Sequence, residues 1–148
     1  MITEKQQGKK RLQLHEIVTS IDVLDTREAK VELIRKYSKH YPSFTDYLRG
    51  LFDEKITWLV PEGKPPYTPS SEAHPSSWDR QHMSLKYFVK GTGYDEMNQV
   101  KRETLWINIL ESIHPEDSVL VADMPDRRHK SSLTKELVTE ALPNLIRK

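Results

Sequence analysis

The sequence contains no cysteine, only 5 glycines and no long apolar run, and these absences remove whole classes of protein. Without cysteine the chain has no disulfides, no thiolate metal sites and no cysteine nucleophile. No stretch approaches the roughly 18 consecutive apolar residues of a membrane-spanning helix, and the polar start of the chain lacks the apolar segment of a signal peptide. We therefore expect a cytoplasmic protein that does not bind membranes.

An excess of one charge sign is also missing, because 23 Lys and Arg residues face 22 Asp and Glu residues. A formal net charge of +1 gives no global field that would draw the protein to nucleic acid, so such binding needs a local patch. Basic residues gather in two short patches, at 127–130 and 9–11: Arg127, Arg128, Lys130, Lys9 and Lys10. They are candidate nucleic-acid contacts, and the alternative is that they belong to solvated loops.

Motifs of catalysis and of metal binding are absent as well. The chain has no G-x-S-x-G sequence, P-loop or dinucleotide fingerprint, and its paired carboxylates stand where helix termini favour acids. None of the 6 histidines forms an i, i+4 pair, and no cysteine accompanies them. We predict no catalytic residue, no cofactor and no metal site, and we expect His114, before Pro115, to accept a backbone hydrogen bond at the start of a helix.

Apolar residues recur at a spacing of three and four over most of the chain, which predicts helices. Examples are the segments 14–24, 77–90, 95–113 and 115–124. We expect a mainly α fold, in which a flexible N-terminus at 1–11 precedes one compact domain of about six helices at 12–148. The longest predicted helix, 95–113, is apolar around much of its circumference, so we expect its C-terminal half to run through the centre of the domain.

A proline-rich loop interrupts this helical pattern at 61–75, where five prolines fall within fifteen residues. The preceding run, Ile56 to Val60, favours a short strand or an extended segment. Aromatic residues flank the loop, and two interpretations of them are open. Trp58, Tyr67 and Trp78 could present a surface for a protein partner. Trp58 and Tyr67 could also fold the loop back onto the helices, and the two interpretations are compatible.

Five local strings, taken in order, carry a family resemblance. They are Leu-Arg-Gly-Leu-Phe-Asp (48–53), Trp-Leu-Val-Pro-Glu-Gly-Lys-Pro-Pro-Tyr (58–67), Val-Lys-Arg-Glu-Thr-Leu-Trp-Ile (100–107), Leu-Glu-Ser-Ile-His-Pro-Glu-Asp (110–117) and Leu-Thr-Lys-Glu-Leu-Val-Thr-Glu-Ala-Leu-Pro-Asn-Leu-Ile (133–146). The chain resembles a family of small proteins of unknown function carried by tailed bacteriophages, including T-even-like and marine phages. The resemblance implies a place in the cytoplasm of an infected bacterium or in the virion, and it implies no activity.

Two functional hypotheses follow from these observations. The first is a non-enzymatic phage accessory protein that acts by protein–protein interaction with host or phage machinery of replication, transcription or virion assembly. The second is a nucleic-acid-binding protein that uses the patches at 127–130 and 9–11, which predicts salt-sensitive binding. The sequence does not identify the partner, and it leaves self-association open.

Overall fold

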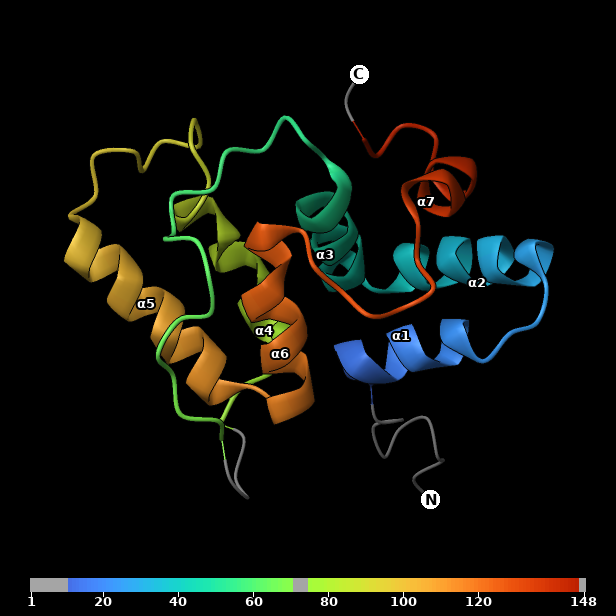
Figure 1. The fold of residues 1–148 in the computed structure, drawn as a ribbon, viewed down its shortest axis with the longest axis horizontal. Coiled ribbons are helices and arrows are strands. Elements are labelled where there is room, and N and C mark those ends of the chain that lie inside the picture. Colours follow the sequence, from blue (N-terminus) through green and yellow to red (C-terminus); the bar gives the residue numbers. More distant parts are fainter. Residues whose placement is uncertain (1–10, 71–74, 147–148) are drawn as a thin grey trace, which may run out of the picture.

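The structure is a computed structural model that describes residues 11–70 and 75–146. Within these residues the chain forms seven α-helices and two short 3-10 helices, which confirms the mainly α prediction (Figure 1): α1 (Leu14–Asp22), α2 (Arg27–His40), α3 (Pro42–Phe52), α4 (Trp78–Gln81), η1 (His82–Tyr87), α5 (Gln99–Ser112), α6 (Pro115–Asp123), η2 (Met124–Asp126) and α7 (Lys135–Ala141). No helix among the described residues has both the length and the apolar character needed to cross a membrane.

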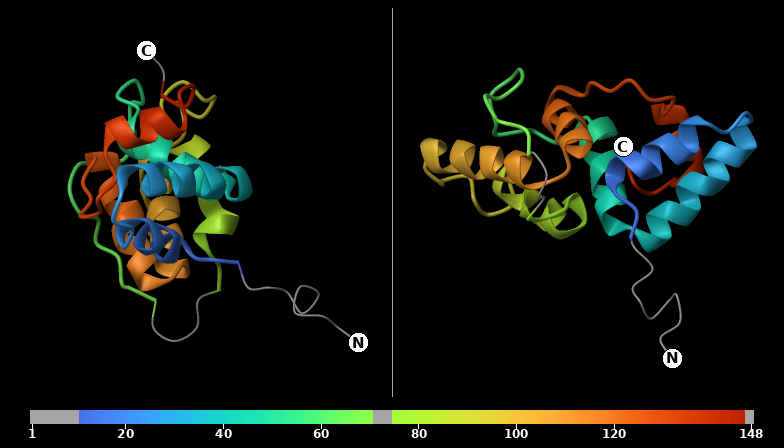
Figure 2. Two further views of the ribbon diagram at one scale, coloured as in Figure 1. Left: turned by 90° about the vertical axis from the view of Figure 1, so that its right-hand side faces the viewer. Right: turned by 90° about the horizontal axis from the view of Figure 1, so that it is seen from below.

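Helix α3 occupies the centre of the fold. It lies between the α1–α2 pair at one end of the molecule and α5 at the other (Figures 1 and 2). It contacts α1, α2, α4, η1 and η2, and Phe44, Tyr47 and Leu48 on it are completely buried. The C-terminal half of the helix predicted at 95–113 does belong to the core, since Leu110 there is completely buried, but it lies beside α3 and not at the centre. Helix α5 lies at the edge of the fold, and Val100 in its first turn is 74% exposed.

The apolar faces of the first helices were predicted correctly. The i, i+3, i+4 pattern of α1 places Leu14, Ile17, Val18 and Ile21 on one side of the helix, and all four are buried. Helix α2 begins after Thr26, whose hydroxyl accepts a hydrogen bond from the Ala29 amide at 3.1 Å. Local periodicity and capping thus account for this part of the core.

The predicted helix at 77–90 is wrong beyond its first turn. Ser77 caps α4, but the chain continues as the 3-10 helix η1 and then becomes extended. The extended residues pair with 57–59 through an isolated antiparallel bridge between Trp58 and Val89. The Leu59 amide donates to the Phe88 carbonyl at 2.7 Å, and the Lys90 amide donates to the Thr57 carbonyl at 2.9 Å. Backbone groups used in this pairing are not available to a helix.

The described part of the proline-rich loop crosses α5 and reaches the end of that helix (Figure 1). Just before the loop, the Leu59 carbonyl accepts a hydrogen bond from the side-chain Nε2 of Gln99, at the start of α5, at 3.1 Å. Near the end of α5, the Thr68 amide donates to the Glu111 carboxylate at 2.7 Å. The loop therefore folds back onto the domain, as the second interpretation of its aromatic residues proposes.

Candidate functional site

A groove of about 830 Å³ lies between α3 and the segment that contains η1 and the turn after it. Two neighbouring parts of the chain meet a third that is distant in sequence. Its walls come from the residues at 42–50 of α3, at 55–58 of the following extended segment and at 82–92. The antiparallel bridge between Trp58 and Val89 holds the last two segments together, so the groove depends on the tertiary fold.

The groove has apolar side chains from two of these segments. Ile56 and Trp58 come from the extended segment, and Leu85 and Val89 come from the other wall. Met83 also lines the groove and is 71% exposed, which is unusual for a large apolar side chain. A flexible, polarisable thioether in such a place adapts to irregular partner surfaces. The groove therefore offers apolar contact area that the described residues do not cover.

Basic side chains surround this apolar area. Four of the lining residues are cationic: Arg49, Lys55, Lys86 and Lys90. The three lysines are exposed. The one carboxylate in the lining, that of Asp46, accepts from Arg49 at 3.1 Å and contacts the His82 ring nitrogen Nδ1 at 2.6 Å. The groove thus has a cationic rim whose single acid is already paired.

The Asp46–His82 contact also fixes the shape of the groove. Asp46 lies on α3 and His82 begins η1, so their hydrogen bond joins the two walls. Both side chains are largely shielded from solvent, with 29% and 13% of the side-chain surface exposed. A hydrogen bond with an ionised acceptor is stronger than a neutral one, which favours a fixed spacing between the walls.

Trp58 approaches α3 closely because residue 50 is glycine. A methyl group at Gly50 would meet the Trp58 ring at 3.0 Å and the Met124 sulfur at 2.6 Å. The indole Nε1 of Trp58 is buried and has no hydrogen-bond acceptor among the described residues. Buried donors are normally satisfied, so this nitrogen is a polar group in the groove lining that the fold leaves without a partner.

The three aromatic residues proposed as a protein-contact surface do not lie together. Trp58 lines the groove, whereas Tyr67 packs partly buried against the core at the loop along α5. Burial, with the negative charge of Asp123, raises the pKa of Tyr67. Trp78 is only 2% exposed, and its Nε1 donates to the Ser43 carbonyl at 2.9 Å. The expectation that Trp78 is an exposed contact is therefore wrong, because α4 buries its ring against α3.

The basic patch at 127–130 also differs from the expectation. Arg127 adopts a left-handed conformation with φ of 58°, and its guanidinium donates to the carbonyls of Gly50, Leu51 and Ile56 at 3.0–3.3 Å. Arg127 is thus a structural residue that ties the turn after η2 to the end of α3. Arg128 and Lys130 remain exposed. Lys9 and Lys10, with most of the predicted flexible terminus, lie outside the described residues.

Sequence reasoning missed the groove residues Lys55, Met83, Lys86 and Lys90. Each is a single basic or apolar residue in a mixed stretch, and none belongs to a run or a motif. Only the bridge between Trp58 and Val89 brings them to one surface. The one available signal was Trp58 itself, in a β-prone segment next to the proline-rich loop.

The fold and the groove define a small, mainly helical protein with an apolar recess rimmed by cations. A family model described as "Family of unknown function (DUF6433)" matches residues 17–131, which is more than half of the chain. The protein belongs to this family. Neither the comparison with curated proteins nor the comparison with solved structures returned a match.

Proposed function

We propose that the protein is a non-enzymatic accessory protein that binds an acidic, amphipathic segment of another protein in the groove between α3 and η1. The observation that carries the proposal is the combination of an exposed apolar side chain, Met83, with three exposed lysines around the same recess. Apolar residues of the segment would contact Met83, Leu85 and Val89. Its carboxylates would face Lys55, Lys86 and Lys90, since opposite charges across an interface favour the correct partner.

A protein segment suits this groove better than nucleic acid does. Proteins that bind single strands stack bases on exposed aromatic rings along a basic track. The groove has one aromatic lining residue, Trp58, which is half-buried and packs against Trp106 with ring centroids 6.5 Å apart. Because the sequence resembles tailed-phage proteins, we propose a host or phage protein of replication, transcription or virion assembly as the partner.

Binding can be measured by fluorescence anisotropy with a labelled synthetic peptide that alternates Glu or Asp with Leu and Phe at helical spacing. We expect the full-length protein to bind this peptide and to reject a twin in which each acid is replaced by Lys. Met83→Glu and the double variant Lys86→Glu, Lys90→Glu should each weaken binding at least about tenfold, which is about 1.4 kcal/mol. Trp58 lines the groove, so its fluorescence should change on binding.

Two exposed residues outside the groove provide matched controls. Val100→Glu introduces the same charge as Met83→Glu at a similarly exposed apolar residue, and Lys130→Glu reverses a charge in the other basic patch. Both should bind like the wild type. Equal binding of the acidic and basic peptides, or equal effects of groove and control variants, would contradict the proposal. The proposal would also be contradicted if the protein bound a labelled single-stranded oligonucleotide through the groove and did not bind the peptide. That result would favour nucleic acid as the ligand.

A further inference from the structure

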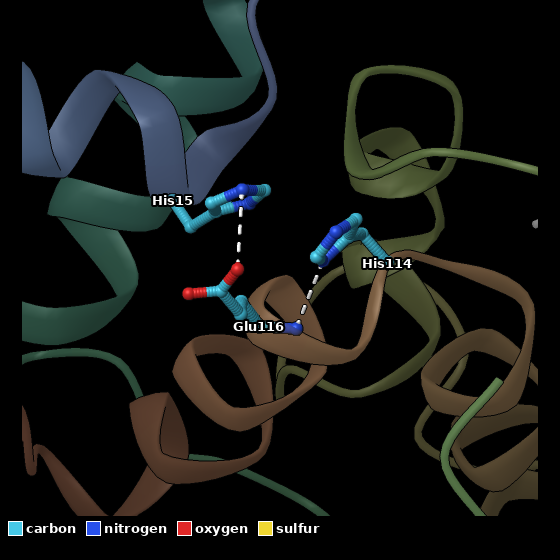
Figure 3. Close-up of side chains that lie close together, drawn as sticks. All are labelled: His15, His114 and Glu116. Atoms are coloured by element: carbon cyan, nitrogen blue, oxygen red, sulfur yellow. Dashed lines mark hydrogen bonds and ion pairs between the residues drawn. The ribbon is translucent and has the colours of Figure 1, made fainter. Parts of the chain in front are cut away.

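A cluster of two histidines and a carboxylate lies away from the groove, where the start of α1 meets the start of α6. His15 comes from α1, whereas His114 and Glu116 flank Pro115 at the start of α6 (Figure 3). One ligand atom from each of the three residues lies within 4.8 Å of the others. The prediction of no metal site rested on spacing along single helices, and this cluster joins residues about 100 positions apart in the chain.

Asp117 orients His15 within this cluster. Its carboxylate is completely buried and lies 2.7 Å from Nδ1 of His15. An ionised carboxylate only accepts hydrogen bonds, so Nδ1 carries a proton, and in the neutral imidazole Nε2 then presents a lone pair. Nε2 of His15 faces Glu116 and lies 3.6 Å from its Oε2 (Figure 3). A carboxylate that holds one ring nitrogen while the other faces a ligand position is the arrangement found around metal-bound histidines.

The separation of these atoms suits a small transition-metal ion. Two ligand atoms about 2.1 Å from a tetrahedral Zn²⁺ ion lie about 3.4 Å apart. The distance of 3.6 Å between His15 Nε2 and Glu116 Oε2 is close to that value. The Glu116 side chain is 70% exposed, so it can rotate to complete the geometry without disturbing packed neighbours.

His114 supplies the third ligand position. Its ring stacks on that of His15 with centroids 4.3 Å apart, and its Nδ1 accepts a hydrogen bond from the Glu116 amide at 3.1 Å. This bond confirms the expected backbone hydrogen bond at His114. Coordination through Nδ1 would replace this hydrogen bond, and the amide of the exposed Glu116 could then bind water. Two imidazoles and one carboxylate, with a fourth position open to water, form a ligand set that zinc adopts in proteins.

We propose that His15, His114 and Glu116 bind one divalent transition-metal ion of the zinc type, with Asp117 as the positioning residue for His15. The ion bridges α1 to the start of α6. Its binding therefore stabilises the folded chain by an amount that grows with the logarithm of the metal concentration above the dissociation constant, because the unfolded chain does not bring the ligands together.

The test uses the full-length protein without a polyhistidine tag, titrated with ZnCl₂ by calorimetry and by thermal unfolding. We expect one ion per chain and a rise in the unfolding temperature that EDTA reverses. Loss of a residue that only hydrogen-bonds a metal ligand weakens metal binding roughly 10–100-fold. We expect a larger loss of zinc affinity when a ligand itself is replaced, in each of the variants His15→Gln, His114→Gln and Glu116→Gln. His40→Gln, which removes an exposed histidine outside the cluster, should bind zinc like the wild type.

A separate readout guards against variants that fail to fold. Co²⁺ in a tetrahedral site with nitrogen ligands gives visible absorption bands, and Glu116→Gln changes an exposed side chain, so that variant should stay folded while the bands weaken or shift. Absence of zinc binding by the wild-type chain would overturn the proposal. Equal zinc affinity in His114→Gln, His40→Gln and the wild type would overturn it as well. Neither result would bear on peptide binding in the groove.

Discussion

At the scale of single residues, Asp117 links two helices that are distant in sequence. It stands in the first turn of α6, and its carboxylate also accepts from the amides of Leu14 and His15 in the first turn of α1, at 3.3 and 2.8 Å. The first amides of a helix have no partner within the helix, and the helix dipole favours a negative charge beside them. One buried carboxylate thus serves the N-termini of both α1 and α6.

Asp117→Asn should lower the free energy of unfolding by about 2–4 kcal/mol. The substitution removes the charge and turns an amide NH₂ group toward donors that need an acceptor, which leaves buried polar groups unsatisfied. Urea unfolding followed by circular dichroism measures the change. Glu116→Gln, in the same turn but exposed, is the matched control and should stay within about 0.5 kcal/mol of the wild type. Similar losses in both variants would show that the buried carboxylate has no special role.

At the scale of elements, Asp79 connects the short helix α4 to its surroundings. Its carboxylate accepts from Arg11 Nε at 2.7 Å and from the Ser43 hydroxyl of α3 at 2.9 Å. Helix α4 has only four residues, so such contacts and the buried Trp78 ring hold it in place. Partial burial opposes ionisation of Asp79, but the hydrogen bonds from Arg11 and Ser43 outweigh it, and the pKa of Asp79 is lowered.

This lowered pKa predicts a pH-dependent contribution of Asp79 to stability. A carboxylate whose pKa is lower in the folded state than in the unfolded state, where it is about 3.9, stabilises the fold at any pH above the unfolded-state pKa. This contribution is lost as the pH falls through the pKa of the folded state. We expect Asp79→Asn to cost up to about 1 kcal/mol near neutral pH, the upper range for a solvent-screened pair. The difference from the wild type should shrink below about pH 4 in urea unfolding. A difference that is constant with pH would contradict the assignment.

At the scale of the whole molecule, the last helix closes the core next to the N-terminal helices. Leu137, Val138 and Ala141 of α7 are buried, and α7 packs against α2. Arg27 of α2 also pairs with Glu140 at 2.6 Å. The family match ends at residue 131, before α7 begins. In this chain, therefore, the apolar face of α2 is covered by a helix outside the matched region.

A chain that ends at Ser131 should be strongly destabilised. Burial of each large apolar side chain contributes about 1.5–3 kcal/mol, so losing Leu137 and Val138 alone costs about 3–6 kcal/mol. That loss is comparable with the roughly 5–15 kcal/mol of a typical domain. Circular dichroism and thermal unfolding should report a lower midpoint or an unfolded chain. A chain that ends at Leu142 keeps α7 and should unfold closer to the wild type; equal midpoints for all three chains would contradict this role of α7.

The sequence by itself determined the helical class of the protein and the buried face of α1. These features depend on residues three or four positions apart, whose geometry a helix fixes locally. The same logic failed at η1 and at the start of α5. There the residues after η1 pair with Trp58 through the backbone, and buried Arg102 donates to the carbonyls of Tyr87 and Tyr94.

Only the tertiary structure decided where the candidate sites lie. The groove needs the extended segment at Trp58 beside Val89, and the histidine cluster needs α1 beside α6. It also decided that Trp78 and Arg127 serve packing and backbone hydrogen bonds, although their residue types suggested contacts with partners. Contacts between distant segments depend on how whole helices pack, and the spacing of residues along one helix does not encode that arrangement.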